Sequence, residues 1–295
     1  MKDGHLIFLV GPTACGKTEA ALAEAERSGA VILSCDSLCV YRGMDIGTAK
    51  PTREEQARVP HFGIDLAEPD EPYSVSRYIR YRDGILEGQR ALGKTVIVAG
   101  GSGFYLRSFF HPVVDGMEIP AGLGGEVADL RRACGLEGLV AALRELNPEG
   151  ETFEGLDLRN PRRVEKALIR CRASGRSWRA LREEFLSLPV PLPDWTKEVR
   201  LIERPPGELR ERNRRRVRRM LESGLVDEVR ALRARGFERN SSACRAIGYR
   251  EVLAFLDGKL PEADLEEAIY THTNQLMRKQ RSWFRHQIPV DRVVP

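Results

Sequence analysis

The sequence lacks the features that mark several classes of protein. No apolar run approaches the roughly 20 residues of a membrane-spanning helix, and there is no internal repeat and no low-complexity tract. The six cysteines form no C-x-x-C pair, and the five histidines show no metal-ligand spacing. We therefore expect no membrane contact, no disulfide framework and no zinc site, but reduced cysteines in a cytoplasmic protein.

Composition and length indicate a soluble globular chain. Of the 295 residues, 42% are apolar and 31% are charged, which is typical of soluble domains. This length allows one large domain or a core domain that carries an inserted lobe. The first apolar run, residues 6–10, leads directly into a glycine-rich loop and so belongs to the folded domain. We therefore expect no signal peptide.

Positive charge is concentrated in blocks, although the net charge is only +4. Residues 159–182 hold nine Arg or Lys against one acid, and residues 204–219 hold eight Arg against two acids. Residues 278–285 add four more basic residues and no acid. One such block would equally fit a solvated helix face. Three of them indicate a polyanionic partner larger than a single phosphate group.

A phosphate-binding loop begins ten residues into the chain. The apolar run 6–10 has the length of a strand, the pattern G-x-x-x-x-G-K-[ST] follows it, and residues 19–26 are helical in character. This strand–loop–helix context predicts a loop whose backbone N–H groups and Lys17 bind a diphosphate or triphosphate, with the Thr18 hydroxyl on Mg²⁺. The expected phosphate ligands are Gly11, Pro12, Thr13, Ala14, Cys15, Gly16, Lys17 and Thr18.

The remaining pattern predicts an α/β fold with a parallel sheet. Short apolar strands at 6–10, 31–34 and 95–99 alternate with helical stretches at 18–27, 74–91 and 103–110, as in parallel sheets. Later segments of the chain supply two more strand candidates, 199–202 and 290–294, and two long helices, about 206–235 and 262–285.

The middle of the chain differs from both ends. Residues 113–195 open and close with Pro- or Gly-rich segments and show helical patterns without an obvious strand. We therefore expect a helical insertion lobe at 113–195, between two parts of a P-loop core at 1–112 and 196–295.

Asp36 follows the second predicted strand. Ligands bind at the carboxyl ends of strands in open α/β sheets, so Asp36 is expected beside the phosphate loop. It could hold Mg²⁺ through water, act as a general base, or merely cap a helix. The strand 95–99 ends in Ala-Gly-Gly without a carboxylate, which argues against a nucleotide hydrolase.

Several motifs together resemble one family. These are the loop 11–18, the block 36–51 (DSLCVYRGMDIGTAKP), and the segments 61–65 (HFGID), 100–105 (GGSGFY) and 245–250 (RAIGYR). The series resembles the tRNA dimethylallyltransferase family over residues 6–286, most weakly at 112–155. The block 36–51 is the most specific part, because nucleotide kinases lack it. No Cys/His zinc motif follows the core, so the chain resembles the bacterial form.

The resemblance implies a prenyl transfer to RNA. A dimethylallyl group would pass from dimethylallyl diphosphate to N6 of the adenosine 3′-adjacent to the tRNA anticodon. The loop 11–18 would then hold the donor's diphosphate, with Mg²⁺ at Thr18. Asp36 would be the base, and Arg212 would lie near the diphosphate unless it is a helix-surface residue.

The resemblance also implies which residues contact the tRNA anticodon stem-loop. We expect a monomer, and we expect the three Trp residues to pack rather than to stack on bases. The expected tRNA contacts are Asp36, Ser37, Leu38, Cys39, Ser102, Arg162, Arg163, Val164, Glu165, Lys166, Arg245, Ala246, Ile247, Gly248, Tyr249 and Arg250.

Three other functions compete with this one. An adenylate isopentenyltransferase would modify a free nucleotide and would need no large basic surface. A P-loop nucleotide kinase or GTPase-like switch would turn over nucleoside triphosphates and leaves the block 36–51 unexplained. A non-catalytic RNA-binding module leaves the phosphate loop unexplained.

Overall fold

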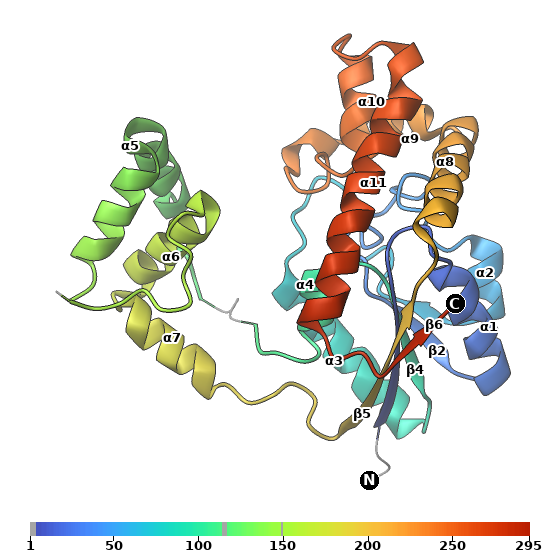
Figure 1. Ribbon diagram of the computed structural model, residues 1–295, viewed down its shortest axis with the longest axis horizontal. Coiled ribbons are helices and arrows are strands. Elements are labelled where there is room, and N and C mark those ends of the chain that lie inside the picture. Colours follow the sequence, from blue (N-terminus) through green and yellow to red (C-terminus); the bar gives the residue numbers. More distant parts are fainter. Residues whose placement is uncertain (1–3, 114–116, 149) are drawn as a thin grey trace. The chain divides into compact units, whose positions relative to one another are not determined.

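The computed structural model describes residues 4–113, 117–148 and 150–295, which form two compact units (Figure 1). The core unit comprises Met1–His111 and Leu192–Pro295, and the inserted unit comprises Pro112–Pro191. The sequence placed the ends of the insertion at 113 and 195. The later end differs because Trp195 already begins a strand of the core sheet.

The core unit is built on one six-stranded parallel sheet, which confirms the predicted α/β class. Its strand order is β3-β2-β4-β1-β5-β6, with β1 between β4 and β5. The short strand β3 was not predicted. The strands are β1 (Gly4–Val10), β2 (Val31–Ser34), β3 (His61–Phe62), β4 (Val96–Ala99), β5 (Trp195–Ile202) and β6 (Arg292–Val294).

Side chains of β1 alternate between the two faces of the sheet, as the two-residue period of a strand requires. Ile7 and Leu9 pack with Leu22 of α1 (Lys17–Ser28) in one apolar cluster. Phe8 points to the other face, where its ring lies 5.1 Å from that of Phe109 in an edge-to-face pair. Because both faces are covered, the strand is continuously apolar.

The helices of the core unit differ from the prediction at one instructive place. The expected helix 206–235 is two helices, α8 (Pro206–Glu222) and α9 (Leu225–Ala234), because Gly224 adopts a left-handed conformation (φ 93°) that ends the first helical run. The others are α2 (Arg53–Arg58), α3 (Val75–Ala91), α4 (Gly103–Arg107), the 3₁₀ turn η1 (Phe237–Arg239), α10 (Tyr249–Leu256) and α11 (Glu262–Gln287).

The inserted unit has its own small core. Its helices are α5 (Leu123–Glu145), α6 (Pro161–Ser174) and α7 (Trp178–Ser187). Val127, Leu139, Val164 and Leu168 are fully buried in one apolar cluster, and Trp178 packs against it. Among the described residues of both units, no helix is both long and apolar enough to cross a membrane.

Parallel pairing brings four chain segments to one edge of the sheet. The loop 11–18 follows β1, Asp36 follows β2, residues 100–102 follow β4 and Arg204 follows β5. Two of these segments touch directly, since Cys35 N donates to Ala99 O (2.8 Å) and Ser102 N donates to Cys35 O (3.2 Å). This edge is where open α/β sheets bind their ligands.

Gly100 permits the close approach of these two segments. A Cβ at this position would lie 2.3 Å from the carbonyl oxygen of Cys35, which is backbone and cannot turn aside. We expect Gly100→Ala to lower the free energy of unfolding by about 1–3 kcal/mol, measured by urea denaturation. Gly84→Ala is the control, because Gly84 lies in α3 with open space around it. It should raise stability by about 0.5–1 kcal/mol, and equal effects of the two variants would refute the steric account.

Candidate active site

The phosphate loop lies between β1 and α1, as the motif predicts. The Lys17 ammonium donates to the carbonyls of Gly11 (2.9 Å) and Pro12 (2.8 Å), so the side chain curls over the loop. Thr18 stands exposed in the first turn of α1. The loop thus combines a helix N-terminus, a cation and a free hydroxyl, a combination suited to a phosphate group.

Two arginines bind the loop from the carboxyl-terminal half of the chain. Arg212 of α8 donates through Nε to the carbonyl of Ala14 (2.8 Å), and Arg204 donates through Nε to the carbonyl of Cys15 (2.8 Å). The sequence indicated Arg212 but missed Arg204. Its only signal was its position two residues after the end of β5, the strand that pairs with β1. Both guanidinium groups add positive charge to the loop.

Asp36 lies in a turn after β2 and caps no helix of the described chain. Its Oδ1 accepts a hydrogen bond from Leu38 N (2.9 Å). The next residue is tied to the loop after β4, because Ser37 N donates to Ser102 Oγ (2.8 Å) and Ser102 Oγ donates to Ser37 Oγ (3.0 Å). Asp36, Ser37 and Leu38 remain partly exposed, whereas Cys39 is buried. The side chain of Cys39 therefore does not face a ligand.

The charge of Asp36 acts on two cations of the site. Burial lowers the pKa of the Lys17 ammonium, and the Asp36 carboxylate is among the groups that oppose this shift. Burial also lowers the pKa of the Arg216 guanidinium, and Asp36 is the first of the charges that oppose it. Asp36 therefore lies within electrostatic reach of both cations. Sequence reasoning missed Arg216, which follows Arg212 by one helical turn.

Gln280 of α11 joins two of the strand-end loops. Its Oε1 accepts hydrogen bonds from Thr13 N (2.8 Å) and Thr13 Oγ1 (3.0 Å), while its Nε2 donates to Gly101 O (3.3 Å). The phosphate loop and the loop after β4 are thus held by one side chain 267 residues away from Thr13. A glutamine in the middle of a helix carries no sequence signal for this contact.

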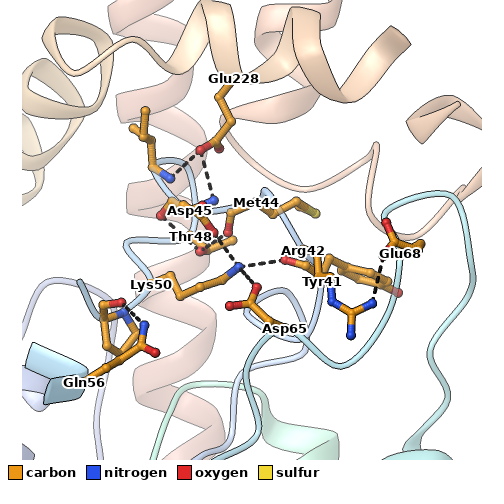
Figure 2. A network of polar contacts seen from close by, with 12 residues as sticks. Tyr41, Arg42, Met44, Asp45, Thr48, Lys50, Gln56, Asp65, Glu68 and Glu228 are labelled. Atoms are coloured by element: carbon orange, nitrogen blue, oxygen red, sulfur yellow. Dashed lines mark hydrogen bonds and ion pairs between the residues drawn. The ribbon is translucent and has the colours of Figure 1, made fainter. Parts of the chain in front are cut away.

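The block 36–51 is shaped by two charged side chains (Figure 2). The ammonium of Lys50, which is 3% exposed, donates to Tyr41 O (2.7 Å), Asp45 Oδ1 (2.5 Å) and Asp65 Oδ1 (2.7 Å). Glu228 of α9 accepts from the backbone N–H groups of residues 45, 46 and 47 at 3.0, 2.7 and 3.2 Å. Together they hold a segment without regular secondary structure in one conformation.

The segment 245–250 divides into exposed and structural residues. Arg245 and Arg250 are exposed, whereas Tyr249 is fully buried and donates through its hydroxyl to Glu228 Oε1 (2.7 Å). The predicted tRNA contact of Tyr249 stays a prediction, and in this structure its hydroxyl supports the carboxylate that binds the N–H groups of residues 45–47. Gly248 is also buried, and Ala246 and Ile247 are partly exposed.

The predicted contact run on α6 of the inserted unit divides in the same way. Arg162, Arg163 and Lys166 are exposed. Glu165 pairs with Arg131 (2.9 Å). Val164 is fully buried in the apolar cluster of that unit, so its side chain is not available to an RNA. The helical period explains the split, because it turns the middle residue of the run inward.

The arginine block 204–219 is likewise no single surface. Arg204 and Arg212, eight residues apart, face the phosphate loop. Arg216, four residues after Arg212, faces Asp36. Arg214 and Arg218 form ion pairs with acidic residues of α11. The helix therefore directs only part of this charge toward the site.

Metal donors in the site are few. The described residues contain no group of three or more His, Cys, Asp or Glu side chains that could hold a metal ion. The oxygen donors present are the Thr18 hydroxyl and the Asp36 carboxylate. Mg²⁺ commonly binds one or two protein oxygens together with substrate phosphates and water. The donor set therefore fits a cation that arrives with a diphosphate.

Fold and site together define a P-loop α/β protein with a carboxylate beside its phosphate loop. The family model described as IPP transferase matches residues 39–287, and that described as isopentenyl transferase matches residues 4–61. The chain therefore belongs to the tRNA dimethylallyltransferase family, which confirms the resemblance found in the sequence.

Individual relatives agree with this assignment. The chain is 48% identical to the tRNA dimethylallyltransferase of Opitutus terrae over 98% of its own length and 92% of the relative. It is 37% identical to tRNA dimethylallyltransferase 2 of Geotalea daltonii, over 96% and 85% of the two chains. The solved structure of a tRNA isopentenylpyrophosphate transferase from Bacillus halodurans superposes with a TM-score of 0.68 at 28% identity, covering 99% and 89%.

The Lys50 cluster should contribute measurably to stability. Lys50→Met removes a buried ammonium that donates to three oxygens, so we expect a loss of about 2–4 kcal/mol in the free energy of unfolding. Arg42→Met is the matched control, because the Arg42–Glu68 pair is 54% and 43% exposed and should contribute less than about 1 kcal/mol. Urea denaturation of both variants measures the difference, and similar losses would contradict a special role for Lys50.

Proposed function

We propose that the protein transfers a dimethylallyl group from dimethylallyl diphosphate to N6 of the adenosine 3′-adjacent to the tRNA anticodon, releasing diphosphate. The observation that carries this proposal is that Asp36, which follows β2, lies at the same edge of the parallel sheet as the phosphate loop, which follows β1. The phosphate loop, which would bind the leaving group, and Asp36, which would accept the proton, thus lie at one edge of the sheet. Membership in a family named for this transfer supports the same assignment.

The phosphate loop acts on the leaving group. As the C–O bond of the allylic donor breaks, negative charge grows on the diphosphate. Backbone N–H groups of residues 14 and 16–18, Lys17 and Arg212 are placed to stabilise that charge, while the N–H groups of residues 13 and 15 hold the loop itself. Contacts with Gln280 and with loop carbonyls hold the loop and its donors in place before the reaction. The entropy of positioning these donors is therefore not lost during the reaction itself.

Asp36 acts on the nucleophile. The exocyclic amine of adenine is weakly nucleophilic because its lone pair is delocalised into the ring. As the new C–N bond forms, the N6 proton passes to the Asp36 carboxylate and then to solvent. Arg216 and Lys17 keep this carboxylate in a cationic surrounding. The acceptor base must leave the RNA stack to reach it.

Mg²⁺ is proposed as the cofactor, with the Thr18 hydroxyl as its protein ligand. When bound, it would neutralise charge on the diphosphate. Thr18 is exposed beside the loop and is thereby free to coordinate. Asp36 offers a second oxygen, directly or through water.

The proposed partner is the anticodon stem-loop of tRNA. Of the residues expected to contact it, those that are exposed or partly exposed support the proposal best: Asp36, Ser37, Leu38, Ser102, Arg162, Arg163, Glu165, Lys166, Arg245, Ala246, Ile247 and Arg250. A monomer in the cytoplasm remains the proposed state. The exposed basic groups lie both on α6 of the inserted unit and in the core unit, which suits a partner with many phosphates.

Transfer of label from radioactive dimethylallyl diphosphate tests the function directly. We expect label on bulk tRNA and none on AMP or ATP, because only an RNA would use the exposed basic residues of both units. Label on AMP but not on tRNA would establish the adenylate isopentenyltransferase instead. Both transfer and diphosphate binding are then measured without Mg²⁺, the binding by calorimetry. The comparison separates the role of the cofactor in binding from its role in transfer.

Substitution of Asp36 tests the assignment of the base. Asp36→Asn keeps the shape and removes the proton acceptor, so single-turnover transfer should fall by about 10²–10⁴-fold while tRNA affinity changes little. Asp264→Asn, at an exposed position of α11, is the control and should transfer at the normal rate. A near-normal rate for Asp36→Asn would show that another group accepts the proton.

A further inference from the structure

Phe104 is an aromatic residue that the fold leaves uncovered. It lies in α4, where it is 60% exposed while its neighbours Tyr105 and Leu106 are 4% and 0% exposed. The short helix thus buries two side chains and presents one ring to solvent. A single exposed apolar residue is common on protein surfaces, so the meaning of this one depends on where it stands.

Phe104 follows closely after a residue that contacts the turn carrying Asp36. Ser102, two residues before Phe104, exchanges hydrogen bonds with the backbone and hydroxyl of Ser37 at 2.8 and 3.0 Å. Two residues of chain span at most about 7 Å. The backbone of Phe104 therefore lies close to the turn that carries Asp36, where the extruded base would bind in the proposed base pocket.

Two basic residues lie on the elements around Phe104. Arg107 lies three residues after Phe104, on the same side of α4. From α11, the Trp283 ring comes within 2.7 Å of the position that a Cβ on Gly103 would take, and Lys279 lies one turn before it. Within residues 4–113, 117–148 and 150–295, no carboxylate forms an ion pair with Arg107 or Lys279. An exposed aromatic residue with unpaired basic residues on the same helix and on the neighbouring helix matches the chemistry of a single-stranded nucleic acid.

We infer that Phe104 is a stacking platform for an unpaired base next to the adenosine that enters the site, with Arg107 and Lys279 facing the phosphates around it. This inference rests on the proposed function. When the acceptor adenosine leaves the anticodon loop, its neighbour loses a stacking partner. The Phe104 ring at the rim of the pocket replaces that partner and so stabilises the extruded state.

Equilibrium binding of a fluorescent anticodon stem-loop tests the inference in the full-length protein. Phe104→Ala should weaken binding by about 5- to 100-fold, whereas Phe104→Trp should bind within about threefold of the parent. Leu92→Ala is the matched control, because Leu92 is a 70% exposed apolar residue just before β4, at the opposite edge of the sheet. It should bind normally. Thermal unfolding of each variant checks that the fold is retained.

A double-mutant cycle identifies the partner of the ring. The base on either side of the acceptor adenosine is replaced, one at a time, by an abasic site. For one of these RNAs, Phe104→Ala should cause no further loss of affinity, since the stacking base is already gone. Equal losses on intact RNA and on both abasic RNAs would overturn the inference.

Failure of the inference and failure of the proposed function give different results. If the parent protein transfers label to the stem-loop but Phe104→Ala binds it normally, the platform is refuted and the transfer stands. If the parent protein neither binds nor modifies the stem-loop, both are refuted before any variant is made.

Discussion

The parallel pairing of β1 with β4 and β5 is the constraint on which the site depends. Strands that run in one direction end at one edge of the sheet, so the segments that follow them must meet there. The phosphate loop, Asp36, residues 100–102 and Arg204 come from four distant parts of the chain and share that edge for this reason alone. The contact of Gly100 with Cys35 shows how close the approach is.

Two charged side chains, one buried and one partly exposed, order the segment that carries Asp36. Lys50 and Glu228 satisfy backbone and carboxylate groups of the block 36–51, which has little regular structure of its own. The segment is thereby ordered before the RNA binds. The entropy of ordering it does not then reduce the affinity for the RNA. Tyr249 contributes from a third element by donating to Glu228. The most specific motif of the family is thus held in place by side chains from three parts of the chain.

Local patterns predicted those parts of the fold and site that depend on local interactions. The loop 11–18 and its flanking strand and helix were recognisable because spacing and residue type suffice to define them. The helix expected at 206–235 was wrong in one respect, since its apolar period continues across Gly224 while the backbone does not. Strand β3 has two residues and its pairing depends on a neighbouring strand, so no periodic pattern marks it.

The order of the residues already predicted the phosphate loop and an acidic residue after β2, because each pattern needs only neighbours in the chain. Tertiary packing decided which basic residues lie next to the loop and next to Asp36. Eight arginines crowd residues 204–219, yet the helical period and the position of α8 bring Arg204, Arg212 and Arg216 to the site and pair others with α11. Gln280 reaches Thr13 only because α11 returns across the sheet edge. Such contacts join residues hundreds of positions apart, and no local pattern encodes them.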